Sequence, residues 1–85
     1  MRLMIVDDFR FIRRHVRTVL GSISGAEVVA EASSGEEAVA LARELRPDVV
    51  LMDISLVDMN GLVATETIRR ELPEVRVLIL SRHVE

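Results

Sequence analysis

The sequence predicts an α/β domain in which a parallel sheet carries helices on both faces. Three short apolar runs rich in β-branched residues, at residues 3–6, 49–52 and 75–80, have the composition of strands buried on both sides. A weaker, charged run at residues 26–32 suits an edge strand. Helical patterns separate these runs, and right-handed crossovers through helices produce a parallel sheet.

The first helical pattern places apolar side chains on one face, and Gly21 follows it as a stop signal. Phe11 lies well off this face, so we expect it to be exposed or covered by another element. The apolar face comprises Phe9, Ile12, Val16, Val19 and Leu20.

The second helix is predicted to begin with a capping box, in which Ser34 is the N-cap and Glu37 follows three residues later. It should end before Pro47. The third helix is predicted to begin near residues 60–61 and to end before Pro73. The order of elements is therefore βαβαβαβ.

Composition restricts the class of function. The 85 residues suffice for one domain, contain no cysteine and are 49% hydrophobic, which excludes a disulfide scaffold and a disordered chain. Acids at residues 7–8 interrupt the N-terminus too early for a signal peptide, and no apolar run approaches the roughly 20 residues of a membrane span. The net charge of −3 and the scarcity of aromatic residues argue against nucleic-acid binding by this segment. We expect a small, soluble, cytoplasmic domain without a membrane partner.

Acidic side chains occur where predicted strands end. Asp7 and Asp8 follow the first strand, Asp53 ends the third, and Ser81 ends the fourth. In a flavodoxin-like sheet, with strand order 2-1-3-4, the first and third strands are neighbours and ligands bind at their carboxyl ends. The three carboxylates should therefore converge, with the Ser81 hydroxyl directed toward the same cleft.

Three converging carboxylates must share protons or hold a cation. Two like charges about 4 Å apart repel by roughly 4 kcal/mol at an effective dielectric constant of about 20. Oxygen ligands from a few carboxylates, completed by water, are typical of Mg²⁺. Either of the two adjacent aspartates alone could instead cap the first helix. The pair, with a third acid at a strand end, favours a metal site.

Five stretches of the sequence resemble the receiver domain of two-component response regulators. The resemblance is strongest to regulators whose effector is a LuxR-type helix-turn-helix, and the spacing of the stretches matches a receiver along the whole chain. The stretches are Leu3-Met4-Ile5-Val6-Asp7-Asp8, Glu31-Ala32-Ser33-Ser34-Gly35-Glu36-Glu37-Ala38, Pro47-Asp48-Val49-Val50-Leu51-Met52-Asp53, Met59-Asn60-Gly61 and Val77-Leu78-Ile79-Leu80-Ser81.

The resemblance implies a role for each site residue. Asp53 corresponds to the phosphoacceptor, which attacks a phosphohistidine on a sensor histidine kinase. Asp8 and Asp53 would ligate Mg²⁺ (or Mn²⁺) directly, Asp7 would act mainly through water, and the backbone carbonyl of Ser55 would be a further ligand. Ser81 corresponds to the switch hydroxyl that hydrogen-bonds the phosphoryl group. Such a domain is a phosphoacceptor rather than an enzyme, with at most weak self-catalysed phosphotransfer and dephosphorylation.

The sequence departs from the family pattern in three respects. Receivers have five βα units, whereas residues 1–85 correspond to a single receiver domain that is incomplete after the fourth strand. The family's lysine and aromatic switch residue belong to the missing units, and all eleven basic residues here are arginine. Val57 replaces a proline in the loop after the acceptor. We therefore expect poor phosphorylation of Asp53.

An incomplete sheet is predicted to associate with a second chain. The outer edge of the fourth strand would lack a neighbour, and apolar side chains of the last two strands would lose their cover. Alternation assigns Val49, Leu51, Val77 and Ile79 to one face, and Val50, Met52, Leu78 and Leu80 to the other. We expect a homodimer or swapped assembly through the fourth strand and the uncovered face.

Other functions fit less well. A dinucleotide-binding domain needs a glycine-rich turn after the first strand, where this chain has Asp7-Asp8-Phe9-Arg10-Phe11. A haloacid-dehalogenase phosphatase needs two aspartates separated by one residue at that place. The alternative that remains is a truncated or pseudo-receiver that acts only as a protein-interaction module. In both cases DNA contact and transcription regulation would need an effector domain absent from this chain.

The other charged residues are interpreted as structural. The adjacent pairs Arg13-Arg14 and Arg69-Arg70 are typical of solvated helix faces rather than phosphate sites. His15 and His83 are isolated histidines, for which a surface or helix-end position is more common than metal ligation.

Overall fold

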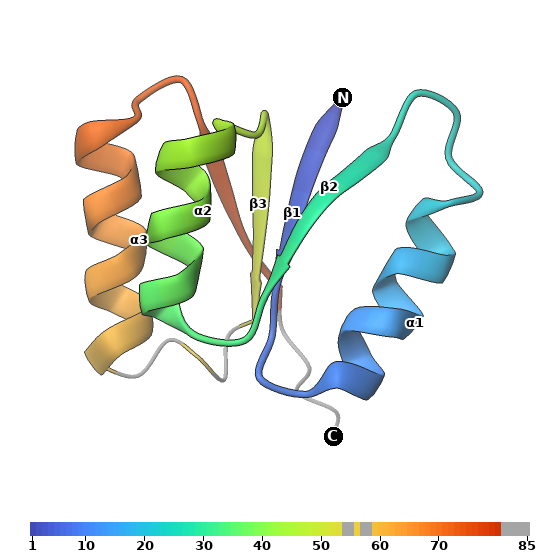
Figure 1. The fold of residues 1–85 in the computed structure, drawn as a ribbon, viewed down its shortest axis with the longest axis horizontal. Coiled ribbons are helices and arrows are strands. Elements are labelled where there is room, and N and C mark those ends of the chain that lie inside the picture. The colour runs from blue at the N-terminus through green and yellow to red at the C-terminus, as the bar shows by residue number, and fades with distance from the viewer. Residues whose placement is uncertain (54–55, 57–58, 81–85) are drawn as a thin grey trace.

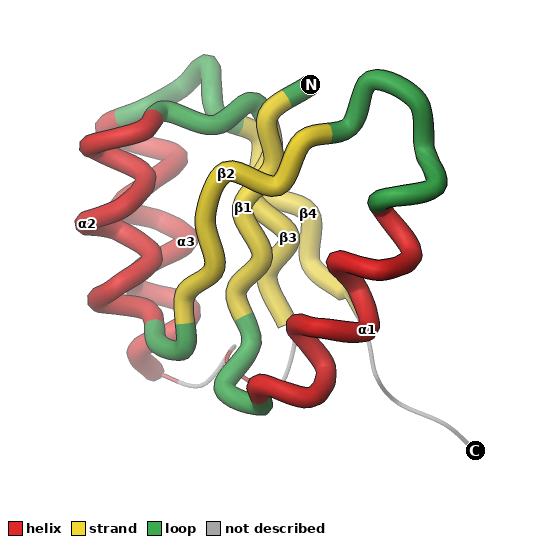
Figure 2. The backbone as a smooth tube through the Cα atoms, turned by 45° about the vertical axis from the view of Figure 1, so that its right-hand side comes forward, coloured by secondary structure: helices red, strands yellow, loops and turns green. Residues whose placement is uncertain are grey.

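A computed structural model describes residues 1–53, 56 and 59–80, which form a parallel sheet between two layers of helices (Figure 1). The strand order in the described part is β2-β1-β3-β4, and each neighbouring pair is parallel. Helix α1 covers one face of the sheet, and α2 and α3 cover the other (Figure 2). The fold class, the strand order and the helices on both faces are therefore as predicted. The elements are β1 (Arg2–Val6), α1 (Arg10–Leu20), β2 (Glu27–Ala32), α2 (Gly35–Leu45), β3 (Val49–Asp53), α3 (Met59–Glu71) and β4 (Arg76–Leu80).

The second helix has the ends that its sequence predicts. The Ser34 hydroxyl accepts a hydrogen bond from the Glu37 N–H at 3.2 Å. The Glu37 carboxylate in turn accepts a hydrogen bond of 2.8 Å from the N–H of Ser33, one residue before the N-cap. The helix ends at Leu45, before Pro47, which disfavours further helix, and Arg46 adopts a left-handed conformation with φ of 46°. None of the described helices is long and apolar enough to cross a membrane.

The packed core lies between the sheet and the layer of α2 and α3. Met4 and Met52, on the central strands, are fully buried there with Ile68 of α3 and Leu72, the residue that follows α3. The two helices are also tied to each other, because the guanidinium of Arg43 donates two hydrogen bonds of 2.8 Å to the Glu71 carboxylate. The strands that carry the site are therefore packed firmly against α2 and α3 on this face of the sheet.

The assignment of β4 side chains to faces was wrong. Val77 pairs directly with Val50, and Ile79 with Met52. Because paired residues of parallel strands point to the same side, Val77 and Ile79 face α2 and α3. Leu78 and Leu80 lie with Leu51 and Asp53 on the side of α1. Alternation gives the two sets within each strand, but the register between strands decides which sets share a face.

The α1 side of the sheet is covered much less completely. No residue of α1 is buried. Phe9 and Val19, which the sequence places on the apolar face, are 55% and 51% exposed, and Phe11 is exposed as expected. A groove of about 820 Å³ lies on this side, and its apolar lining includes Leu3, Leu20, Ile23, Val49, Leu51 and Leu78. The helix therefore leaves part of the apolar sheet surface open.

Candidate functional site

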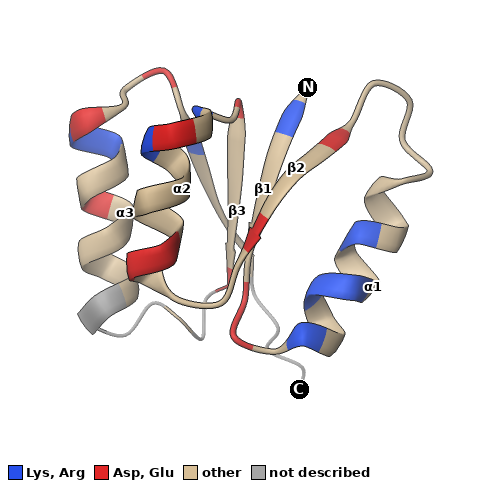
Figure 3. Ribbon diagram, in the orientation of Figure 1, with Lys and Arg blue, Asp and Glu red and all other residues tan. Residues whose placement is uncertain are grey.

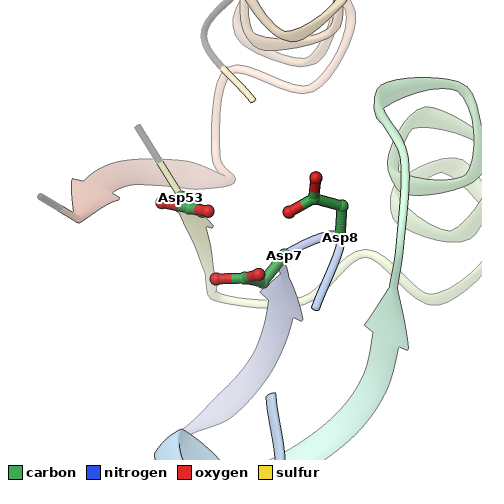
Figure 4. A group of neighbouring side chains, drawn as sticks. All are labelled: Asp7, Asp8 and Asp53. Carbon is green, nitrogen blue, oxygen red and sulfur yellow. The ribbon is translucent and has the colours of Figure 1, made fainter. Parts of the chain in front are cut away.

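Three aspartates meet at the carboxyl ends of the two central strands, as the sequence predicts. Asp7 follows β1 directly, Asp8 is the next residue, and Asp53 is the last residue of β3. Figure 4 shows their carboxylates around a common space, and one carboxylate oxygen from each lies within 4.8 Å of the others. The residues come together because β1 and β3 are paired neighbours that end at the same edge. This convergence confirms the predicted juxtaposition.

Burial differs among the three acids. Asp7 and Asp53 are each only 3% exposed, whereas Asp8 is open to solvent. Two buried carboxylates and one exposed carboxylate around one space repel one another unless a cation or proton lies between them. All donors are hard oxygen atoms, which suit Mg²⁺ or Mn²⁺ better than a metal that prefers nitrogen or sulfur. The donor set therefore fits a magnesium-type ion.

Asp7 is held at both its backbone and its side chain. Its N–H donates to the carbonyl of Ala32 at the end of β2, at 3.0 Å. Its carboxylate accepts the N–H of Phe9 at 2.8 Å, which turns the chain into α1. Its own carbonyl accepts a hydrogen bond of 2.7 Å from the guanidinium of Arg13. These bonds fix the direction in which the acidic segment leaves β1.

Arg13 is not the solvated helix residue that the sequence analysis expected. Its side chain is only 15% exposed and also pairs with the Glu31 carboxylate at 3.1 Å, while Arg17 binds the other oxygen at 2.6 Å. Burial alone would raise the pKa of Glu31, but the hydrogen bonds and charges of Arg17 and Arg13 outweigh it, and the pKa is lowered. Figure 3 shows basic positions along α1, beside the edge strand β2, which carries acidic positions.

Sequence reasoning missed this cluster, although a signal for it exists. Glu31 stands between two alanines at the half-buried end of its strand, where an uncompensated charge is costly. Arg13 and Arg17 are one helical turn apart, so they lie on the same side of α1. An acid in a half-buried strand together with two arginines at that spacing could have indicated the pairing.

A cleft of about 300 Å³ adjoins the acidic cluster on the α1 side. Asp7 and Asp53 line it together with Leu80 and with His15, for which the sequence predicted a surface or helix-end position. The other predicted site residues, Ser55 and Ser81, lie outside the described residues, as do Val57 and His83. The described part of the site therefore consists of the three aspartates, the cleft beside them and the Arg13 contact behind Asp7.

The fold and this site define a doubly wound α/β domain with clustered oxygen ligands at the strand ends. The model of the response regulator receiver domain family matches residues 3–85, so the chain belongs to that family. It is therefore a receiver domain sequence of two-component response regulators, as the motif resemblance indicated.

Relatives and solved structures agree with this membership. The response regulator protein VraR of Staphylococcus aureus is 41% identical over all 85 residues, which correspond to 41% of its length. A LuxR-family two-component response regulator from Aurantimonas sp. has a TM-score of 0.88 and 40% identity, covering 98% of this chain and 59% of that one. The CheX–CheY–BeF3–Mg²⁺ complex from Borrelia burgdorferi has a TM-score of 0.85 and 26% identity, covering 100% and 64%. The chain thus spans about two fifths of the curated relatives that it matches.

Proposed function

We propose that this chain is a phosphoacceptor receiver in which Asp53 accepts a phosphoryl group from a sensor histidine kinase. The observation that carries the proposal is the placement of Asp7, Asp8 and Asp53 within 4.8 Å in a member of the receiver family. The assignment of residues 1–85 to one receiver domain and a cytoplasmic location beside the kinase are parts of the same proposal.

The three aspartates would hold Mg²⁺ or Mn²⁺. Asp8 and Asp53 would be direct ligands, Asp7 would act mainly through water, and the backbone carbonyl of Ser55 would add a further oxygen. The Mg²⁺ in the Borrelia burgdorferi complex supports this choice of ion. When bound, the ion would neutralise charge on the transferring phosphoryl group and on the carboxylates around it.

The proposed chemistry at Asp53 is a single displacement at phosphorus. A carboxylate oxygen of Asp53 attacks phosphorus, an O–P bond forms, and the N–P bond of the phosphohistidine breaks with its electron pair returning to the imidazole nitrogen. Asp53 is 3% exposed and lines the cleft beside the cluster, from which the donor would approach. The Ser81 hydroxyl would donate a hydrogen bond to the phosphoryl oxygens. The chain would act as an acceptor rather than as an enzyme, with at most weak self-catalysed transfer and hydrolysis.

A second candidate function is interaction without efficient phosphorylation. No lysine exists among the 85 residues to place a fixed cation at the transferring oxygens. Losing one such preorganised group typically slows a reaction by about 10²–10³-fold. A truncated or pseudo-receiver would then act through its surfaces alone. Likeness to a LuxR-family regulator supports a role in transcription, with DNA contact through an effector domain outside residues 1–85.

We further propose a second copy of this chain as a partner. Within the described residues, β4 ends the sheet on one side, and Leu78, on that strand, is 55% exposed. Pairing of β4 with β4 of a second copy would continue the sheet across a two-fold axis and bring the exposed apolar side chains of the two β4 strands side by side. A parallel or swapped arrangement would bury the same strand.

The proposed phosphorylation is tested by incubating the 85-residue chain with a small acyl phosphate and Mg²⁺, followed by mass spectrometry of intact protein and peptides. We expect slow, partial modification that maps to Asp53 and is absent from Asp53→Asn. Modification that persists in Asp53→Asn would contradict the acceptor assignment. No modification even after prolonged incubation with donor or with an autophosphorylated histidine kinase would favour the interaction module. Rapid, complete modification would show that the lysine is dispensable.

A further inference from the structure

Arg13 connects the acidic segment to the rest of the fold in a way that its neighbours do not. Its Nη1 donates to the carbonyl of Asp7 at 2.7 Å, while its Nε binds Glu31 on β2 at 3.1 Å. Arg17 binds the same carboxylate at 2.6 Å, but its side chain is half exposed and no described contact joins it to Asp7. Arg13 is thus the member of this cluster that touches both the strand and the acidic segment.

We propose that Arg13 is a positioning residue, which sets the cation affinity of the aspartate cluster by holding the backbone of Asp7. The inference rests on the proposed function, because it concerns the same metal site. Two donors of one rigid guanidinium hold two acceptors at a fixed separation, which a lysine ammonium on a flexible stem cannot reproduce. One oxygen of the Asp7 carboxylate accepts the Phe9 N–H, and Arg13 holds the Asp7 carbonyl. By fixing this backbone group, Arg13 sets the direction in which the Asp7 carboxylate points.

Electrostatics alone predicts the opposite result, which makes the proposal testable. A positive guanidinium beside the site repels a divalent cation, so removing it should tighten Mg²⁺ binding. If Arg13 acts by positioning, its removal weakens binding despite the lost repulsion. Partners behind metal ligands typically change metal affinity by about 10–100-fold when they are mutated.

The experiment compares Arg13→Lys and Arg13→Gln with Arg17→Lys and Arg17→Gln, each as the 85-residue chain. Mg²⁺ is titrated at one protein concentration while backbone amide shifts of residues 7, 8 and 53 are followed. We expect both Arg13 variants to bind Mg²⁺ about tenfold more weakly, and both Arg17 variants to stay within about twofold of the native chain. Tighter binding by Arg13→Gln, or equal binding by Arg13→Lys, would overturn the proposal. Urea unfolding of every variant verifies that the fold is kept.

A second readout separates this inference from the metal proposal. Hydrogen exchange of the Phe9 amide, measured without Mg²⁺, reports the turn that Arg13 holds. We expect faster exchange at Phe9 in Arg13→Lys than in Arg17→Lys. If the native chain shows no Mg²⁺ shifts, the metal proposal fails, and the exchange rates still decide whether Arg13 positions the segment. Equal Phe9 exchange in the two lysine variants would refute that role.

Discussion

The backbone of Gly61 lies so close to Leu56 that a Cβ atom on Gly61 would stand 1.2 Å from the Leu56 carbonyl oxygen. Gly61 belongs to the first turn of α3, and Leu56 lies in the connection that follows Asp53. The missing side chain lets the Leu56 backbone pack directly against the first turn of α3. The position of Leu56 therefore depends on a glycine at the third residue of α3.

We predict that Gly61→Ala destabilises the fold, because the Leu56 backbone must move to admit a methyl group. Overpacking of this kind costs about 1–3 kcal/mol. The control is Gly21→Ala, whose Cβ would meet the nearest carbonyl oxygens at 3.4 Å, an ordinary contact, and which should change stability by less than about 0.5 kcal/mol. Urea unfolding at one fixed protein concentration measures both. Equal stability of the two variants would show that the Leu56 backbone can move to admit the methyl group without a loss of unfolding free energy.

Addition of Mg²⁺ should shift the amide signals of residues near Asp7, Asp8 and Asp53. The affinity should be modest, because Mg²⁺ keeps several of its waters. Asp8→Asn should abolish most of the response, since it removes a charge and a ligand. Glu66→Gln, an acid on the exposed side of α3, removes the same charge far from the cluster and should leave the titration unchanged. Shifts confined to other segments would contradict the metal site.

The contribution of Glu31 to stability should depend on pH in a defined direction. The folded-state pKa of Glu31 lies below its ordinary value of 4.5, so its stabilising contribution is complete above the unfolded pKa and is lost as the pH falls through the folded pKa. The native chain should therefore exceed Glu31→Gln in unfolding free energy at about pH 6, and the difference should shrink toward about pH 2.5. Glu27→Gln, on the exposed start of β2, is the matched control. A difference that stays constant with pH would mean that charge is not involved.

Self-association through β4 predicts that Leu78→Glu shifts the chain toward monomer. Burial of one such side chain is worth about 1.5–3 kcal/mol, and a charge at the interface adds a desolvation cost, so the dissociation constant should rise at least about tenfold. Val63→Glu places the same charge on an equally exposed apolar site of α3 and should have no such effect. Sedimentation over a wide concentration range measures both. A native chain that is a monodisperse monomer with cooperative unfolding would contradict the proposed partner.

The sequence was sufficient to predict the elements, the strand order and the meeting of three aspartates. Strand composition and helix end signals are local properties, and the carboxyl ends of neighbouring parallel strands must share an edge. The capping box shows the limit of such rules. Ser34 caps as predicted, but Glu37 reaches Ser33, because the side-chain torsions, which the motif does not specify, choose between adjacent N–H groups.

Features that depend on register or on long side chains could not be predicted in this way. A shift of one residue between β3 and β4 exchanges the faces of Val77 and Leu78, and no pattern within either strand fixes that shift. The helical pattern placed Phe9 and Val19 inward, but burial also requires an element on the other side, which α1 alone does not supply. Arg13 was misjudged because the spacing of Arg13 and Arg17 was not set against the acid at Glu31, and because its contact with Asp7 exists only in the folded chain.

The unequal cover of the two faces has a thermodynamic consequence for the acidic cluster. A helix without a buried side chain needs less free energy to open locally than the opposite helix layer, which is packed against the buried core. When α1 moves away from the sheet, the hydrogen bond from Arg13 to Asp7 breaks. The geometry of the strand ends therefore depends on the fraction of molecules in which α1 is packed against the sheet. If the proposed cation binds, reciprocity requires that whatever holds α1 against the sheet would strengthen its binding, and that the bound cation would in turn stabilise the closed position of α1.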